Sequence, residues 1–382
     1  MNKKLLNKVR KQFNQLFKKE PKLIFSPGRI NLIGEHTDYN NGFVLPAATN
    51  KGIVLAISKS NTGISRISAI NKDEIFEFEI NSKISLTQIS WRSYIIGVVS
   101  EIEKKNKVID NFNAVFAGNI PSGAGMSSSA ALENSFVFGL NEVFDLNLTK
   151  LEMIQISQKA EHNYVGVNCG IMDQYSSMFG EKKTALLLDC KSIKSKKYKI
   201  KLQNHSFVLI NTNVNHNLSD SSYNKRRKVC ELVAEKLKID SLREATIESL
   251  NKIKNKITID EFEKALYVLE ENNRVLSFSK AIKEKNIEKL GELLLESHKG
   301  LSELYKVSCK ELDFLVDFAK LNPNILGARM MGGGFGGCTL NLIKKGKYQE
   351  IKQLAMKKYK KEFGKSCEIY RVKLSKGTHL IN

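Results

Sequence analysis

Residues 123–131 have the composition of a phosphate-binding turn, Gly-Ala-Gly-Met-Ser-Ser-Ser-Ala-Ala. They follow a short apolar run, 114–117, and precede a helical pattern, 132–140, so we expect a strand, a turn and a helix in this order. Glycine lets a backbone approach a ligand closely, and the first N–H groups of a helix lie unpaired at the positive end of its dipole. This arrangement suits phosphate, although a loop that only caps a helix has the same composition. The turn lacks both the Gly-Lys-[Ser/Thr] of a Walker A loop and the Gly-x-Gly-x-x-Gly of a dinucleotide turn.

A second segment, residues 26–39, reads Ser-Pro-Gly-Arg-Ile-Asn-Leu-Ile-Gly-Glu-His-Thr-Asp-Tyr. Its arginine, glutamate, histidine and aspartate stand close to isoleucine and leucine, and such polar groups are not buried without partners. Their density favours a ligand rich in hydroxyl groups, such as a sugar, over a solvated turn.

A third segment, residues 327–338, contains five glycines among the six positions 332–337. This composition indicates a backbone packed tightly against another loop or against the phosphate site, although a flexible hinge has the same composition.

Together the three segments resemble the GHMP kinase superfamily, and residues 28–39 narrow the resemblance to its galactokinase branch. Residues 119–130 are similar to the superfamily's phosphate loop, 170–174 to the stretch with its catalytic aspartate, and 216–227 to a segment with a sugar-contacting tyrosine. The resemblance extends from about Phe25 to the C-terminus. Three residues depart from the usual pattern: Ile30 for Val, Met126 for Leu and Met331 for Thr.

The resemblance implies an α+β fold with two lobes, mixed sheets and an active site in the cleft between the lobes. We expect residues 1–195 to form the N-terminal lobe, with residues 26–39 (the sugar segment), the phosphate loop and the catalytic aspartate. Residues 196–382 would form the C-terminal lobe, with Tyr223 and the third glycine segment.

The resemblance also implies direct in-line transfer from ATP, with Asp173 as the base and Arg29 stabilising the transition state. Mg²⁺, which prefers oxygen ligands, would be held by Ser129 and Glu161. The sugar would be bound by Glu35, His36, Thr37, Asp38, Gly170, Asp173 and Tyr223. The nucleotide would be bound by Ser68, Gly123, Ala124, Gly125, Met126, Ser127, Ser128 and Ser129.

The implied reaction is phosphorylation of the anomeric hydroxyl of D-galactose to α-D-galactose 1-phosphate, the entry step of galactose catabolism. Two alternatives stay open. The same fold could act on N-acetylgalactosamine, because the sequence does not reveal how much room the C2 substituent has. A non-catalytic galactose sensor is less favoured, because residues 127–131, Arg29 and Asp173 are all present.

The composition is that of a globular protein, with 382 residues and a formal net charge of +21. The lysines are spread along the chain rather than clustered with arginines and aromatic residues, so we expect no nucleic-acid partner. Six cysteines form no Cys-x-x-Cys pair, which fits free thiols in a reducing compartment. Residues 1–20 lack the apolar core of a secretory signal, and no uncharged apolar stretch approaches the ~20 residues of a membrane span. We therefore expect a cytoplasmic monomer without a membrane partner.

Apolar spacing predicts helices at 3–19, 91–103, 151–165, 223–237, 260–283, 286–298, 302–320 and 349–363. Apolar runs predict strands at 52–58, 65–70, 75–80, 184–189, 207–211, 327–330, 338–343 and 367–372. We expect residues 26–28 in a loop, Asp173 in a polar loop after a helix, and the lysine-rich stretch 191–201 at the seam between the two lobes.

Overall fold

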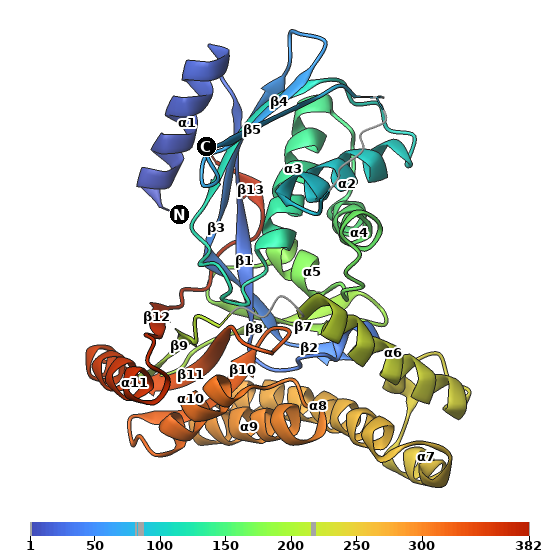
Figure 1. Cartoon of the computed structure of the whole chain (residues 1–382), viewed down its shortest axis with the longest axis vertical. Helices are drawn as coiled ribbons and strands as arrows, with labels where there is room; N and C mark the ends of the chain where they lie inside the picture. Colours follow the sequence, from blue (N-terminus) through green and yellow to red (C-terminus); the bar gives the residue numbers. More distant parts are fainter. Residues whose placement is uncertain (1, 81, 83–87, 215–218, 382) are drawn as a thin grey trace.

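The computed structural model describes residues 2–80, 82, 88–214 and 219–381. Figure 1 shows two parts, an upper one built around a large sheet and a lower one rich in helices. Within these residues the strands form three sheets, and the largest combines antiparallel pairs with one parallel pair. The predicted α+β fold with mixed strand pairing is therefore confirmed.

The upper sheet has six strands in the order β13-β1-β3-β6-β4-β5, and only the pair β4–β6 is parallel. These strands are β1 (Lys22–Asn31), β3 (Pro46–Lys59), β4 (Ser65–Ala69), β5 (Glu74–Phe78), β6 (Phe112–Gly118) and β13 (His379–Leu380). The end of the chain thus returns to the first part, where β13 pairs with β1 (Figure 1).

Helices cover both faces of this sheet. On one face lies α1 (Lys3–Phe17), which packs against alternate β3 side chains such as Val54. On the other face the next β3 side chain, Leu55, packs among the remaining helices of this part. These helices are α2 (Trp91–Glu103), α3 (Ser128–Phe144), α4 (Lys150–Ala160) and α5 (Met172–Phe179). The sheet therefore holds the starts of α3 and α5 at fixed positions.

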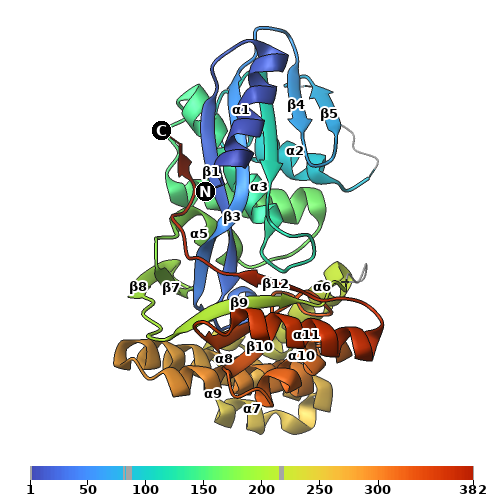
Figure 2. The same ribbon diagram turned by 90° about the vertical axis from the view of Figure 1, so that its left-hand side faces the viewer.

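The lower part contains an antiparallel sheet in the order β10-β11-β9-β12. Its strands are β9 (His205–Asn211), β10 (Ile325–Met331), β11 (Cys338–Lys344) and β12 (Glu368–Arg371). Its helices are α6 (Ser219–Leu237), α7 (Ile247–Lys252), α8 (Ile259–Glu284), α9 (Ile287–Lys299), α10 (Lys310–Lys320) and α11 (Tyr348–Phe363). Figure 2 shows α8 to α11 gathered below β9. Successive side chains of β9 pack in two different clusters. Leu209 packs with residues of α8 and α9, and Ile210 packs with residues of α10 and α11.

A third sheet of three short strands connects segments that are distant in sequence, in the order β2-β7-β8. They are β2 (Phe43–Val44), β7 (Thr184–Asp189) and β8 (Lys194–Lys199). Short 3₁₀ turns cover Asp38–Asn40, Leu242–Glu244 and Lys254–Lys256, and π turns cover Glu161–Val165 and Gly300–Leu304. None of the helices in the described residues combines the length and the hydropathy needed to cross a membrane.

Most predicted elements are confirmed to within a few residues, but the loop expected at residues 26–28 is wrong. These residues belong to β1, which continues to Asn31. The register of β1 against β3 shifts between Pro27 and Arg29, so the proline lies at an irregularity of the strand pairing. A proline-glycine pair therefore marks a bulge here and not the end of a strand.

The lysine-rich stretch 191–201 contains the strand β8, which pairs with β7, and its place at the seam between the lobes stays a prediction. Two further expectations need correction. The helix expected at 302–320 begins only at Lys310, after the π turn. Asp173 lies in the first turn of α5 rather than in a loop. The division of the chain between residues 195 and 196 stays a prediction.

Candidate active site

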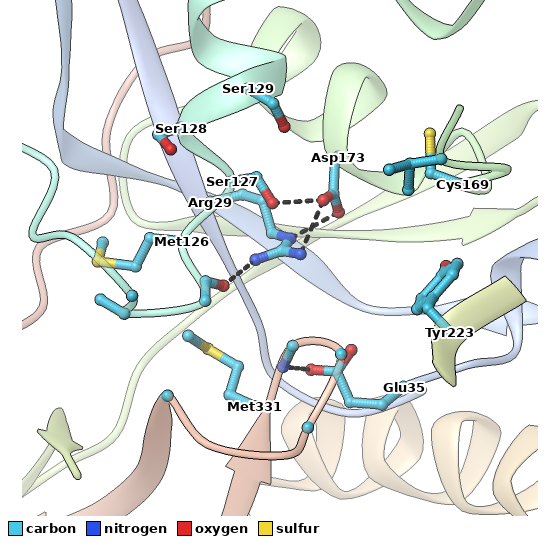
Figure 3. A pocket seen from close by; sticks show the side chains of 18 of the residues that line it. Arg29, Glu35, Met126, Ser127, Ser128, Ser129, Cys169, Asp173, Tyr223 and Met331 are labelled. Atoms are coloured by element: carbon cyan, nitrogen blue, oxygen red, sulfur yellow. Dashed lines mark hydrogen bonds and ion pairs between the residues drawn. The ribbon is translucent and has the colours of Figure 1, made fainter. Parts of the chain in front are cut away.

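The three segments singled out by the sequence meet around one cavity of about 430 Å³ (Figure 3). Its lining comes from both parts of the molecule. It consists of Arg29, Glu35, His36, Asp38, Tyr94, Ile120, Pro121, residues 123–129, Glu161, Val167, Cys169, Met172, Asp173, Val214, Tyr223 and residues 331–337. The predicted cleft between the two parts is thus a real cavity.

Glycines allow the three segments to touch. A Cβ on Gly28 would lie 2.5 Å from the carbonyl oxygen of Met126, and the Arg29 N–H donates to that oxygen at 3.1 Å. Gly125 has φ +62°, and a Cβ there would lie 2.9 Å from the carbonyl oxygen of Met331. The sugar segment and the third glycine segment therefore both pack directly against the backbone of the phosphate loop.

A bidentate ion pair joins Arg29 to Asp173 in this cavity (Figure 3). Arg29 Nε donates to Asp173 Oδ1 at 2.7 Å, and Nη2 donates to Oδ2 at 2.8 Å. The hydroxyl of Ser127 also donates to Oδ2, and Arg29 Nη1 donates to the carbonyl of Gly125. The Arg29 side chain is only 6% exposed and that of Asp173 is 23% exposed. The carboxylate is therefore held rigidly and still reaches the cavity.

The phosphate loop leads into the N-terminus of α3 as predicted. Ser127 is the N-cap residue, in the left-handed region at φ 53°, and α3 begins at Ser128. Figure 3 shows Ser127, Ser128 and Ser129 around this helix start. The first N–H groups of the helix and its dipole thus lie at the cavity, which favours an anion there.

Asp38 supplies a second buried carboxyl group to the cavity wall. Burial raises its pKa to about 7, and the charge of Asp173 adds to this rise. Thr37 lies next to it but does not line the cavity, because its hydroxyl donates to the carbonyls of Gly34 and Phe43.

Glu35 is engaged mainly with the third segment. Its Oε1 accepts from Arg329 Nη2 at 3.0 Å and from the Gly332 N–H at 2.9 Å. Arg329 is fully buried and also donates to the carbonyls of Asn31 and Leu32. Burial alone would raise the pKa of Glu35, but the two arginines Arg329 and Arg29 hold it below its ordinary value. This glutamate therefore fixes the glycine loop against the sugar segment.

Aromatic rings close one side of the cavity. The ring of His36 lies 5.4 Å from that of Tyr223, and Tyr223 lies 5.1 Å from Tyr39. Burial lowers the pKa of His36 to about 4, so the ring is neutral at pH 7. Figure 3 places Tyr223 across the cavity from the phosphate loop.

Glu161 and Ser129 both line the cavity and offer the hard oxygen donors that suit Mg²⁺. Gln174 Nε2 donates to Glu161 Oε2 at 2.9 Å, and this orients the carboxylate. Within the described residues no group of three or more His, Cys, Asp or Glu could hold a metal ion by itself. Mg²⁺ commonly uses one or two protein oxygens beside substrate phosphates, so this donor set fits Mg²⁺.

Two other predicted residues stand apart from the cavity lining. Ser68 lies in β4, and its hydroxyl accepts from Gln12 of α1 at 3.0 Å. Gly170 lies behind Asp38 and does not itself line the cavity. Residues 216–227 resemble the segment with a sugar-contacting tyrosine, and His216 and Leu218 of this stretch lie outside the described residues.

Sequence reasoning missed several lining residues, among them Tyr94, Ile120 and Pro121. Tyr94 comes from α2, where the sequence offers no polar motif, whereas Ile120 and Pro121 lie within the 119–130 phosphate-loop segment but are apolar and were not expected to contact a ligand. Arg329 could have been found, because an arginine between apolar residues in a predicted strand requires buried partners.

Comparison with known proteins agrees with this geometry. Residues 11–59 match the galactokinase galactose-binding signature. Residues 93–181 match the N-terminal domain of GHMP kinases, and residues 278–362 match their C-terminal domain. The matched segments contain Arg29, Asp173 and the two glycine loops.

Relatives match along nearly the whole chain. A galactokinase of Thermotoga maritima is 42% identical over 93% of this chain and 99% of its own length. A galactokinase of Clostridium perfringens is 39% identical over 97% of this chain and 98% of its own length. The crystal structure of Lactococcus lactis galactokinase complexed with galactose is 33% identical, covers 98% of this chain and 100% of its own, and superposes with a TM-score of 0.95. The chain therefore belongs to the galactokinase family of GHMP kinases.

Proposed function

We propose that this galactokinase-family chain, which phosphorylates galactose with ATP, transfers the γ-phosphoryl group to the anomeric hydroxyl. The product is then α-D-galactose 1-phosphate, the compound with which galactose catabolism begins. The main support is the Asp173 carboxylate, which Arg29 and Ser127 hold at the cavity between the phosphate loop and the sugar segment.

Asp173 acts as the base in this proposal. Within the described residues its Oδ2 accepts two hydrogen bonds and its Oδ1 accepts one. A carboxylate oxygen has two lone pairs, so Oδ1 can accept the proton of a sugar hydroxyl. The bidentate contact to Arg29 fixes the direction of this lone pair, and such positioning supplies much of the rate in phosphoryl transfer.

Arg29 and the start of α3 stabilise the charge that builds up on the transferred group. The arginine is buried and keeps its proton at working pH, and the helix dipole points at the same cavity. In this proposal both act on the phosphoryl oxygens, while Asp173 acts on the sugar hydroxyl that attacks the phosphorus.

Mg²⁺ would be held by Glu161 and Ser129 and would neutralise charge on the phosphates. Gln174 keeps the Glu161 carboxylate turned toward this position. The backbone of residues 123–129 would wrap the triphosphate of ATP.

On the sugar side, Asp38 and Tyr223 support the binding of galactose hydroxyls, with His36 behind them. Glu35 would also bind the sugar through its carboxylate, while its Oε1 accepts a hydrogen bond from the Gly332 N–H. The six cysteines, all within the described residues, are unpaired, which supports a reducing cytoplasmic location.

The test is a sugar panel with ATP and Mg²⁺, in which ADP release is measured and the position of the phosphate is assigned by NMR. We expect turnover of galactose with the phosphate on C1 in the α configuration, and a kcat/KM at least about tenfold above that for N-acetylgalactosamine. Phosphate on another carbon would overturn the proposed regiochemistry. Equal or reversed preference would refute galactose as the preferred substrate.

A further inference from the structure

Four side chains form a chain of hydrogen bonds that begins at His36 in the cavity wall and continues behind it through Tyr39, Tyr305 and Cys230. We call this set the tyrosine chain. His36 Nδ1 lies 2.7 Å from the Tyr39 hydroxyl, which lies 2.7 Å from the Tyr305 hydroxyl. The Cys230 sulfur lies 3.3 Å from the Tyr305 oxygen. At the other end, His36 Nε2 lies 3.2 Å from the carbonyl oxygen of Gly333.

The chemistry of the groups fixes the direction of every bond. The Gly333 carbonyl can only accept, so His36 Nε2 carries the hydrogen. The buried imidazole is neutral, so its Nδ1 has no hydrogen and must accept from Tyr39. The Tyr39 oxygen then accepts from Tyr305, and the Tyr305 oxygen accepts from the Cys230 thiol. Only one tautomer of His36 satisfies the whole series, because the other would place two lone pairs against each other at Gly333.

The tyrosine chain joins elements that are far apart in sequence. His36 and Tyr39 belong to the sugar segment, Tyr305 follows the π turn Gly300–Leu304, and Cys230 lies in α6. Tyr305, Cys230 and His36 are almost fully buried, so these bonds are shielded from water. The series ends at a carbonyl of the third glycine segment, which lines the cavity.

The charged groups around His36 affect its protonation but not its tautomer. Glu35 favours its protonation, whereas Arg226 and Arg329 oppose it together with burial. Arg226 donates to the carbonyls of Tyr305 and Lys306, and Arg329 donates to Glu35. These groups set the charge state of the imidazole. They do not determine which ring nitrogen keeps its hydrogen, because in the described parts of the chain the hydrogen-bond partners of the two nitrogens are Tyr39 and Gly333.

We propose that Tyr39 is a positioning residue: its hydroxyl fixes His36 as the Nε2–H tautomer and thereby fixes the Gly333 carbonyl and the Tyr223 ring at the sugar side of the cavity. Loss of the Tyr39 hydroxyl removes the only donor to Nδ1 among the described residues. The imidazole is then able to turn or to change tautomer, and the wall formed by Tyr223 and Gly333 loses its support. This inference rests on the proposed sugar side of the cavity, although its first readout does not require turnover.

The first readout is the tautomer of His36 in the full chain, measured by ¹⁵N NMR of labelled histidine. His36→Gln assigns the signals. We expect the wild type to carry its hydrogen on Nε2 only, and Tyr39→Phe to give a mixture of tautomers. An Nδ1–H tautomer in the wild type would overturn the inference whether or not galactose is phosphorylated, so its failure is distinct from failure of the proposed function.

The second readout is steady-state kinetics. For Tyr39→Phe we expect KM for galactose to rise about five- to tenfold, with kcat and KM for ATP within about twofold of wild type. Cys230→Ser keeps a donor to Tyr305 and should behave like the wild type. Tyr359→Phe is the matched control, because it also removes a buried tyrosine hydroxyl. That hydroxyl donates to the Thr212 carbonyl at 2.8 Å, and neither residue lines the cavity.

If Tyr39→Phe does not fold, the tautomer of wild-type His36 still tests the inference, because an Nδ1–H tautomer would contradict donation from the Tyr39 hydroxyl. An unchanged galactose KM in the folded variant would overturn the positioning role, even with an altered tautomer. An equal rise of KM for galactose and ATP would do the same, because it would indicate general loosening.

Discussion

The Asp38 carboxylate occupies the space that a side chain at Gly170 would need: a Cβ there would lie 2.1 Å from Asp38 Oδ2. The absence of a side chain at residue 170 therefore sets the position of a carboxyl group in the cavity wall. Gly170 therefore contacts a cavity-lining carboxyl group without lining the cavity itself.

Gly170→Ala should move Asp38 and weaken sugar binding. We expect KM for galactose to rise at least about tenfold, which corresponds to about 1.4 kcal/mol, with KM for ATP nearly unchanged. Gly63→Ala is the control, because a Cβ at this exposed turn meets nothing within 4 Å. Steady-state kinetics of both variants gives the answer, and a galactose KM equal to that of wild type would show that the contact has no role.

Arg29→Lys should impair the chemical step. Lysine keeps the charge but cannot form the two parallel bonds to Asp173, so we expect kcat to fall about 10²- to 10³-fold. Arg66→Lys is the matched control, because Arg66 pairs with Glu77 on an exposed strand and such pairs contribute little. A kcat within threefold of wild type, measured by ADP release, would mean that a point charge is sufficient.

The raised pKa of Asp38 predicts a dependence of stability on pH. The folded state keeps a proton on Asp38 up to about pH 7, whereas the unfolded carboxyl loses it near pH 4. The folded state thus binds more protons in this window, and this group makes the free energy of unfolding fall as pH rises from about 4 to about 7. His36 acts in the opposite direction below pH 6.5, because its folded pKa is about 4.

Comparison with Asp38→Asn isolates the contribution of Asp38, since His36 is common to both proteins. The stability of the mutant relative to wild type should increase between pH 4 and pH 7, by at most about 4 kcal/mol. Urea unfolding at several pH values measures this difference. A difference that does not change with pH would show that Asp38 ionises normally in the folded protein.

Removal of Mg²⁺ should abolish turnover, and Glu161→Gln should raise the Mg²⁺ concentration for half-maximal rate about tenfold or more. Glu284→Gln, at the exposed end of α8, is the control. Titration of activity with Mg²⁺ after treatment with EDTA tests both variants. The same Mg²⁺ dependence for Glu161→Gln and wild type would remove Glu161 from the metal site.

The turn between β6 and α3 could be predicted from the sequence, because its glycines and serines follow an apolar run and precede a helical pattern, and its phosphate-binding role stays a prediction. The loop expected at Pro27 was wrong, because the sequence does not show that Gly28 packs against Met126 and that the strand continues past the irregularity. Such tertiary contacts override the local preference of proline and glycine.

Grouped polar side chains predicted the cavity lining at Glu35, His36 and Asp38 but not at Thr37, whose hydroxyl is bonded to backbone carbonyls, and their roles in binding stay predictions. Ser68 was placed near the nucleotide by resemblance, yet its hydroxyl contacts Gln12 and it does not line the cavity. Tyr305 and Cys230 had no signal, because their role depends on a chain of contacts between segments that the sequence does not reveal as neighbours.

The most direct test of the account is Asp173→Asn, with galactose binding measured by calorimetry and kcat measured by ADP release. Asp145→Asn is the control, because Asp145 is an exposed helix cap in a left-handed conformation that asparagine also adopts. The account predicts that Asp173→Asn binds galactose within a few-fold of wild type while kcat falls by about 10³-fold or more. A variant that keeps near-normal kcat would contradict the assignment of Asp173 as the base.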